Sequence, residues 1–170
     1  MREKTCLVVI DVQNGIFRLK QPVYNSASFL RTLREMIVAA KMHSVSIIYT
    51  QHENDTFLSR NSENWKIVDG IGPVDHDAFI IQKKRPGIFD DTGLIDFLHR
   101  EKITTLCIAG LISNGCIREA CLDGLKNGFR IVLVADAHGT FYKNAEKIIE
   151  KINNEMRSQG VEIKQSMELW

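Results

Sequence analysis

The sequence lacks a charge excess of either sign and has no long hydrophobic run. Its 170 residues include 22 Lys and Arg against 21 Asp and Glu, which gives a net charge of +1. The one basic run, 83–85, is too short to form a face that neutralises the phosphates of a nucleic acid. The longest stretch without a charge, 103–117, is too short and too polar to cross a bilayer. We therefore expect neither a nucleic-acid partner nor a membrane partner.

Cysteine pairs with a recognisable spacing are also missing. The four cysteines are Cys6, Cys107, Cys116 and Cys121. They form no CxxC pair and no zinc-binding spacing. The first apolar run, 6–10, ends at Asp11, so no signal peptide is visible. These absences predict a cytoplasmic protein with free thiols.

What is present is the composition of a globular protein. Hydrophobic residues make up 44% of the chain and charged residues 25%, which excludes disorder as the main state. A chain of this length is large enough to bury a core of its own. No repeat, linker or low-complexity tract divides it, so we expect residues 1–170 to form a single domain.

The apolar pattern alternates between strand spacing and helix spacing. Short apolar runs, typical of buried strands, occur at 6–10, 45–49, 78–81, 105–109, 130–135 and 161–163. Helical spacing occurs at 29–40, 94–98, 117–124 and 145–156. We expect Asp91 to cap the second of these helices. The alternation predicts right-handed βαβ units, hence an α/β domain of three layers, α/β/α, around a parallel sheet.

Chemically active side chains follow three of the predicted strands, where ligands bind in such sheets. Asp11 follows the first strand, Lys83 follows the third, and Cys116 begins the helix after the fourth. A helix N-terminus stabilises a thiolate and lowers the pKa of the thiol. Together a carboxylate, an ammonium and a thiol can act as a nucleophilic apparatus. Taken singly, Asp11 is equally compatible with a turn former and Cys116 with a buried cysteine, while Lys83 is more typical of a solvated lysine.

One long segment, 52–77, fits neither spacing. Unstructured loops of this length are uncommon and are often functional. This one follows the second predicted strand, on the side where a ligand would bind. Trp65 in this loop either lines a pocket or pins the loop to the domain.

Three blocks of the sequence resemble the isochorismatase-like cysteine hydrolases in order and spacing. They read LVVIDVQNGIF, IIQKKRPGIFDDTGLIDFL and LCIAGLISNGCIREACLDGLKNGFRIVLVADAH. The resemblance implies a six-stranded parallel sheet in Rossmann-like order, a homo-oligomer (dimer or higher) and a catalytic triad of Asp11, Lys83 and Cys116. Lys83 is preferred to Lys84 because the family lysine lies six positions before a phenylalanine, here Phe89.

The resemblance also implies an oxyanion hole. Its donors would be the backbone N–H groups of Ile112 and Cys116, and a cis peptide bond after Leu111 would turn the first of them inward. The N–H of Cys116 also belongs to the first turn of the predicted helix, where backbone donors have no helical partner.

Departures from the family pattern concern the substrate and metal sites. Gly87-Ile88 replaces the usual Ser-Ala, and Ser113 replaces the usual Thr. Nicotinamidases of this superfamily carry an Asp and two His as metal ligands after the second strand, and the segment 50–55 does not reproduce them. We therefore expect no metal and no organic cofactor, although a metal held by His52 and Asp55 stays an alternative. The residues expected at the substrate pocket are Phe17, His52, Trp65 and His138, and for His138 a role in stabilising its loop is an equal alternative.

The residues and the resemblance together predict a cysteine hydrolase with a small-molecule substrate. We expect it to cleave a C–N bond of a small amide, imide or carbamoyl compound through a Cys thioester intermediate. Two alternatives stay open at this point. One is a hydrolase of an isochorismate-like vinyl ether, and the other is a non-catalytic binding protein with the same fold.

Overall fold

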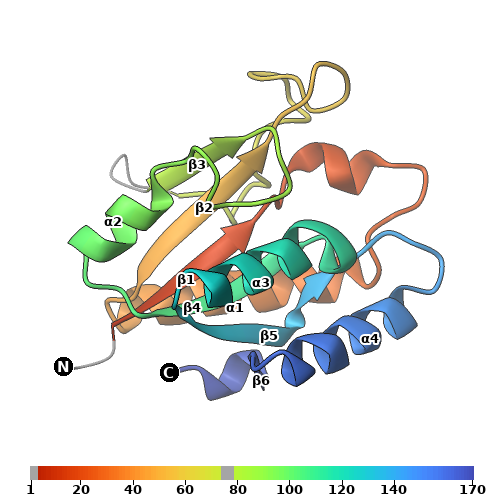
Figure 1. Cartoon of the computed structure of the whole chain (residues 1–170). Coiled ribbons are helices and arrows are strands. Elements are labelled where there is room, and N and C mark those ends of the chain that lie inside the picture. Colours follow the sequence, from red (N-terminus) through yellow and green to blue (C-terminus); the bar gives the residue numbers. More distant parts are fainter. Residues whose placement is uncertain (1–3, 74–78) are drawn as a thin grey trace.

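A six-stranded parallel sheet forms the middle layer of the protein (Figure 1). The computed structural model describes residues 4–73 and 79–170. The strands are β1 (Thr5–Ile10), β2 (Ser46–His52), β3 (Phe79–Lys83), β4 (Thr105–Leu111), β5 (Arg130–Gly139) and β6 (Glu162–Lys164). They lie in the order β3-β2-β1-β4-β5-β6, and each neighbouring pair is parallel. The predicted fold class is confirmed, while Ala78, the expected start of the third strand, lies outside the described residues.

Helices cover both faces of this sheet. They are α1 (Ser26–Met42), α2 (Leu94–Arg100), α3 (Arg118–Lys126) and α4 (Ala145–Ser158). The expectation that Asp91 caps α2 is wrong, because the residue before the helix is Gly93 and no side chain caps it. Instead, the hydroxyl of Thr92 accepts a hydrogen bond from the N–H of Leu94 at 3.3 Å. None of the helices in the described residues is long and apolar enough to span a membrane.

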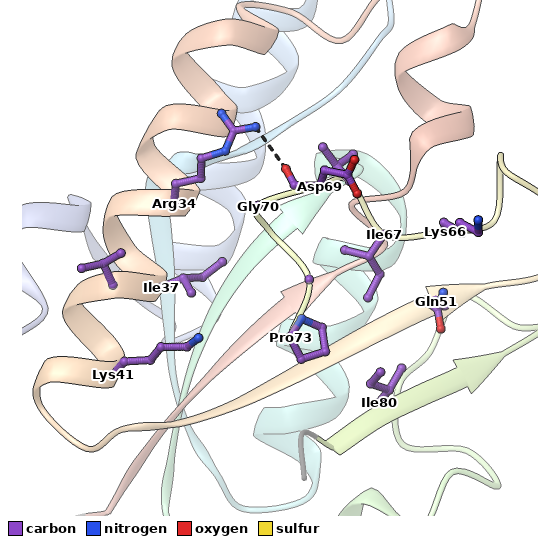
Figure 2. Close-up of a pocket in the computed structure, with 13 residues that line it drawn as sticks. Arg34, Ile37, Lys41, Gln51, Lys66, Ile67, Asp69, Gly70, Pro73 and Ile80 are labelled. Atoms are coloured by element: carbon purple, nitrogen blue, oxygen red, sulfur yellow. Dashed lines mark hydrogen bonds between the residues drawn. The ribbon is translucent and has the colours of Figure 1, made fainter. Parts of the chain in front are cut away.

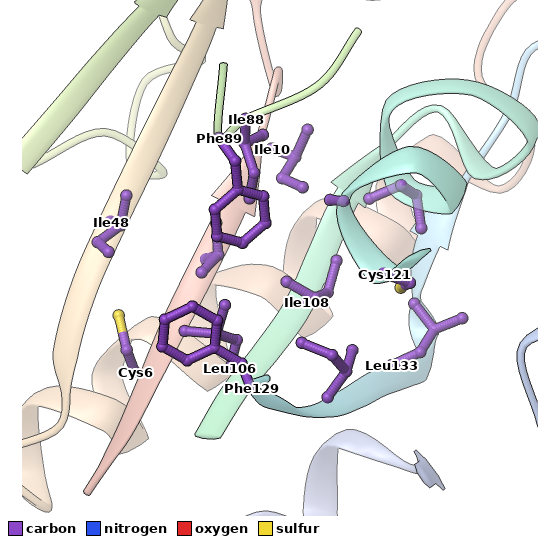
Figure 3. Packing of buried hydrophobic residues seen from close by; sticks show 14 of the residues in the cluster. Cys6, Ile10, Ile48, Ile88, Phe89, Leu106, Ile108, Cys121, Phe129 and Leu133 are labelled. Carbon is purple, nitrogen blue, oxygen red and sulfur yellow. The ribbon is translucent and has the colours of Figure 1, made fainter. Parts of the chain in front are cut away.

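Strand β1 shows why the sheet needs helices on both sides. Successive side chains of a strand point to opposite faces, and β1 is apolar at every position from Cys6 to Ile10. Cys6, Val8 and Ile10 join a core cluster beneath α2, α3 and α4, part of which Figure 3 shows. Leu7 and Val9 join a second cluster beneath α1. The continuous apolar run thus produces the three layers.

The sheet changes winding direction between β1 and β4. From β1 the chain proceeds outward through β2 and β3, and then returns to β4 on the other side of β1. The two central strands approach closely at Gly110, whose φ is +121°. A Cβ there would lie 2.2 Å from the carbonyl oxygen of Ile10, so only glycine fits. The carboxyl ends of β1 and β4 therefore form the point where such sheets bind ligands.

The long segment after β2 is packed rather than free, although it has no helix or strand of its own in its described part. Leu58, Trp65 and Ile71 are all buried. The segment is tied to the residues after β1 by backbone hydrogen bonds, including one from Asn14 N–H to the carbonyl of Lys66 at 2.9 Å. It thus covers the carboxyl end of the sheet on the β1–β2 side.

Candidate active site

The sheet brings the carboxylate of Asp11, the ammonium of Lys83 and the thiol of Cys116 together. Asp11 follows β1, Lys83 is the last residue of β3, and Cys116 lies in a turn after β4. Lys83 Nζ is 2.7 Å from Asp11 Oδ2 and 3.4 Å from Cys116 Sγ. Asp11 and Lys83 are each only 5% exposed, so this is a buried ion pair in contact with a half-buried thiol.

The neighbouring lysines have opposite surroundings. Lys83 also donates to the carbonyl oxygens of Arg85 at 3.2 Å and Pro86 at 3.3 Å, so its ammonium is enclosed by acceptors. The side chain of Lys84 is 70% exposed and lies 3.7 Å from the carboxylate of Glu53. The alternation of side chains at the end of β3 therefore puts Lys83, and not Lys84, beside the thiol.

Thr50 fixes the orientation of the Asp11 carboxylate, and sequence reasoning did not single it out. Its hydroxyl donates to Asp11 Oδ1 at 2.5 Å, while Lys83 binds the other oxygen. The N–H of Asp11 in turn donates to the carbonyl of Thr50 at 3.2 Å. Asp11 has a positive φ of 50°. The carboxylate is thereby held with one oxygen toward Lys83.

The thiol of Cys116 is protonated in this environment. Burial first, and then the negative charge of Asp11, raise the pKa of Cys116 to about 12, although the ammonium of Lys83 acts in the opposite direction. The expectation of a lowered pKa from a helix N-terminus is therefore wrong. The reason is the surroundings of the sulfur, since burial and the carboxylate of Asp11 raise the pKa more than the ammonium of Lys83 lowers it. Cys116 lies in the kinked turn Ser113–Ile117, after the non-helical residues Asn114 and Gly115 and before α3.

His138 links the turn that contains Cys116 to α4 through its two ring nitrogens. Its Nδ1 is 2.9 Å from Ser113 Oγ, and its Nε2 is 3.0 Å from Asn153 Oδ1 on α4. The ring is 3% exposed, and burial lowers the pKa of His138 to about 4. The expectation that His138 lines the substrate pocket is therefore corrected to a structural role. The peptide bond between Leu111 and Ile112, where the turn starts, is cis.

The pocket that contains Cys116 has a volume of about 290 Å³. Its lining residues are Asp11, Gln13, Ile16, Leu19, His52, Asn54, Phe57, Leu58, Leu111, Ile112, Cys116 and Phe141. Of the four residues expected at the substrate pocket, His52 is among these. Phe17 instead stacks on Phe29 with ring centroids 6.3 Å apart. Phe57 and Phe141 were missed, because no spacing in the sequence relates their two loops.

Trp65 pins the long segment to the sheet and does not line this pocket. Its carbonyl accepts hydrogen bonds from Gln13 Nε2 at 2.8 Å and Gln51 Nε2 at 3.2 Å. Gln13 Nε2 also donates to the carbonyl of His52, and Gln13 Oε1 accepts from the N–H of His52, both at 2.9 Å. The buried amide of Gln13 thus fixes the end of β2, and with it the ring of His52, at the pocket wall.

His52 presents an unsatisfied nitrogen. The residue is half-buried, and its Nδ1 is enclosed without a hydrogen-bond partner in the part of the chain that the structure describes. Burial lowers the pKa of His52, and the charge of Lys83 lowers it further, so the ring is neutral near pH 7. Within residues 4–73 and 79–170, no group of three or more His, Cys, Asp or Glu side chains could hold a metal ion.

A larger hollow of about 660 Å³ lies elsewhere, between α1, the β2–β3 side of the sheet and residues 66–73 (Figure 2). Its rim carries the cationic side chains of Arg34, Lys41 and Lys66. Arg34 donates to the carbonyl of Asp69 at 3.3 Å. This hollow contains none of Asp11, Lys83 and Cys116, so its size does not make it the candidate active site.

Fold and site together define a three-layer α/β protein with a carboxylate, an ammonium and a thiol at the point where the sheet changes direction. The family model of the isochorismatase domain matches residues 5–162. The chain therefore belongs to the isochorismatase family of hydrolases.

Individual relatives agree with this assignment. A streptothricin hydrolase of Streptomyces noursei is 24% identical over 143 residues, which are 83% of this chain and 56% of the relative. An N-carbamoylsarcosine amidase of Arthrobacter sp. is 34% identical over 74 residues, 44% of this chain and 28% of the relative. This chain thus spans about half the length of the streptothricin hydrolase. A cysteine hydrolase of Pseudomonas syringae has the same fold, with a TM-score of 0.90, 18% identity and coverage of 98% of this chain and 90% of its own.

Proposed function

We propose that the protein is a cysteine hydrolase that cleaves a C–N bond of a small amide, imide or carbamoyl compound. The observation that carries this proposal is the contact of Lys83 Nζ with both Asp11 Oδ2 and Cys116 Sγ, at 2.7 and 3.4 Å, beside a pocket of substrate size. Relatives named as a streptothricin hydrolase and an N-carbamoylsarcosine amidase support hydrolysis of this type.

The first step is attack by sulfur on the carbonyl carbon. Because the resting thiol is protonated, a base must remove its proton as the C–S bond forms. Asp11 is the base, since its carboxylate is held against the thiol by Thr50 and Lys83. Lys83 stabilises the negative charge that passes between the carboxylate and the sulfur. The carbonyl oxygen then carries a negative charge, which the N–H groups of Ile112 and Cys116 bind.

The second step releases the amine and the third restores the enzyme. Asp11 returns its proton to the nitrogen as the C–N bond breaks, so that ammonia or an amine leaves and a thioester remains. Asp11 then takes a proton from a water molecule that attacks the thioester. The C–S bond breaks, the sulfur regains that proton, and the acid product leaves. No oxidant, reductant or organic cofactor enters this balance.

The test is a screen of small amides, imides, ureas and vinyl ethers for turnover, with amine and acid product measured together. We expect amide-type compounds to be hydrolysed, and Cys116→Ala to reduce kcat by at least about 10⁴-fold. Asp11→Asn should cost about 10²–10⁴-fold, the range of a general base. We expect these losses without loss of the folded circular dichroism spectrum.

Lys84→Met is the matched control for Lys83→Met, because the two lysines adjoin and only Lys83 contacts the thiol. Of these two lysine variants, Lys83→Met should abolish turnover and Lys84→Met should leave it unchanged. Unchanged turnover after dialysis against a chelator is expected as well. Hydrolysis of vinyl ethers alone, or turnover that survives Cys116→Ala, would overturn the proposal, as would a screen with no turnover at all.

A further inference from the structure

We propose that the pocket selects neutral carboxamides with an apolar body of about one ring, and disfavours substrates that carry a carboxylate. This inference rests on the proposed function, since it assigns a substrate class to the same site. It comes from the lining of the pocket and the distribution of its charges.

The pocket wall is mostly hydrocarbon. Seven of its twelve lining residues are apolar: Ile16, Leu19, Phe57, Leu58, Leu111, Ile112 and Phe141. A volume of about 290 Å³ lies at the lower end of the range for small-molecule sites. Burial of an apolar ring there is favourable because it removes apolar area from water. The wall therefore favours a compact apolar group attached to the reacting amide.

The charges of the site oppose a second anion. None of the twelve lining residues is lysine or arginine, and Asp11 is the one carboxylate among them. The ammonium of Lys83 behind it is already bound to Asp11 and to the carbonyls of Arg85 and Pro86. A substrate carboxylate would lose its hydration and gain no ion pair in return. The cations Arg34, Lys41 and Lys66 lie around the separate hollow of Figure 2.

Apart from Asp11, the polar side chains that line the pocket are neutral. His52 lines the wall, and burial and the ammonium of Lys83 lower the pKa of its ring. A neutral imidazole can donate or accept a hydrogen bond but supplies no positive charge for a carboxylate. The polar side chains of Gln13 and Asn54, which also line the pocket, are uncharged as well. An amide group has both donors and acceptors for contacts with such side chains.

The test uses two benzamides that differ in one group at the far end of the ring. 4-Methylbenzamide is neutral and 4-carbamoylbenzoate is an anion of similar shape. Each is added to the wild-type protein, and the rate of alkylation of Cys116 by iodoacetamide is followed by mass mapping. This measures occupancy of the pocket whether or not turnover occurs. We expect the neutral compound to halve the alkylation rate at a concentration at least tenfold lower than the anion. Equal protection, stronger protection by the anion, or protection by neither compound would overturn the inference.

A charge introduced at the pocket should change this preference. Phe57 lines the pocket and is 37% exposed, so Phe57→Lys can place an ammonium at the opening without burying it. We expect the ratio of the two protecting concentrations to move at least tenfold toward 4-carbamoylbenzoate. Met167→Lys, at a position that is 88% exposed and outside the pocket lining, adds the same charge and should leave the ratio unchanged. Equal ratios in the two variants would contradict the proposed role of charge.

The two proposals fail in different ways. If 4-carbamoylbenzoate is hydrolysed as fast as 4-methylbenzamide with dependence on Cys116, the proposed function stands and the substrate class is wrong. If the neutral amide protects Cys116 as expected while neither it nor any other amide is hydrolysed, the proposed function fails and the selectivity of the pocket stands.

Discussion

The four cysteines have the same side-chain chemistry but differ in exposure. Cys6, Cys107 and Cys121 are buried, whereas Cys116 is partly exposed in its pocket. Desolvation raises the pKa of each of the three buried thiols. Because only a thiolate reacts with alkylating agents and access is also required, exposure distinguishes Cys116 where the direction of the pKa shift does not.

We therefore expect a stoichiometric amount of iodoacetamide to label Cys116 before the other three cysteines. The pKa of Cys116, raised to about 12, should make this reaction slower at pH 7 than that of a free thiol such as glutathione. The rate should rise as the pH increases above 9. Mass mapping over a pH series measures both effects. Labelling of Cys6 or Cys121 first, with Cys116 untouched, would contradict the assignment.

The ring of His138 should make the free energy of unfolding depend on pH. Burial lowers its pKa to about 4 from 6.5 in a free chain. Between these values the unfolded chain binds a proton that the folded protein does not, so stability falls as the pH falls from 6.5 to 4. The loss from this one group is about 3 kcal/mol.

In His138→Gln the free energy of unfolding should be lower at pH 7, because two hydrogen bonds of the ring are disturbed, and should depend less on pH between 6.5 and 4. His43→Gln is the control, since that side chain is exposed. Urea unfolding at several pH values measures the slope. An unchanged slope in His138→Gln would show that the ring is not held neutral.

At the scale of secondary structure, the contact between β1 and β4 positions two of the candidate catalytic residues. Gly110 has no Cβ, and this permits the approach of the two backbones just before Asp11 and the turn with Cys116 diverge. Gly110→Ala should cost about 3 kcal/mol or more, because it adds a clash with Ile10 to an unfavourable φ. Activity should fall with it, since the strand ends separate.

The control for this substitution is Gly72→Ala. Among the residues that the structure describes, a Cβ at Gly72 would meet nothing nearer than Ile67 Cγ2 at 3.4 Å, and the φ of Gly72 is not positive. Chemical denaturation of both variants gives the comparison. If Gly110→Ala proves as stable as Gly72→Ala, the close approach of the strands is not required for folding.

Strands and helices were predictable because their patterns are local. The run from Cys6 to Ile10 is apolar on both faces, and this pattern alone indicates a central strand. The apolar positions of α1, among them Phe29, Leu33 and Met36, recur at helical spacing and face the sheet. Parallel order then brings the residues after each strand to one edge, so Asp11, Lys83 and Cys116 could be proposed as neighbours.

The segment after β2 was not predictable, because its order comes from distant contacts. Gln13 joins the backbones of His52 and Trp65, which are 39 and 52 positions away. No periodicity records such a link. The same holds for Thr50 beside Asp11, and for Phe57 and Phe141 in the pocket. The raised pKa of Cys116 likewise depends on how completely the folded chain encloses the thiol.

At the scale of the whole molecule, the oligomeric state remains a prediction. We expect a dimer or larger assembly, as the resemblance implied. Several large apolar side chains are exposed, including Val38 at 58% and Met42 at 80%, both on α1. Exposed apolar patches of this kind often mark interfaces. Size-exclusion chromatography with light scattering measures the mass directly, and the mass of a single chain would contradict the expectation.

The pairing of Asp11 with Lys83 has a consequence for the behaviour of the protein in solution. With a protonated thiol and an uncharged His52 beside them, the opposite charges cancel and the centre presents almost no net charge to an approaching molecule. Dissolved ions screen attraction between separated charges over about 8–10 Å, but they have little to screen when a neutral substrate meets such a centre. Turnover should therefore be nearly independent of ionic strength, and encounter with the substrate should proceed by unguided diffusion.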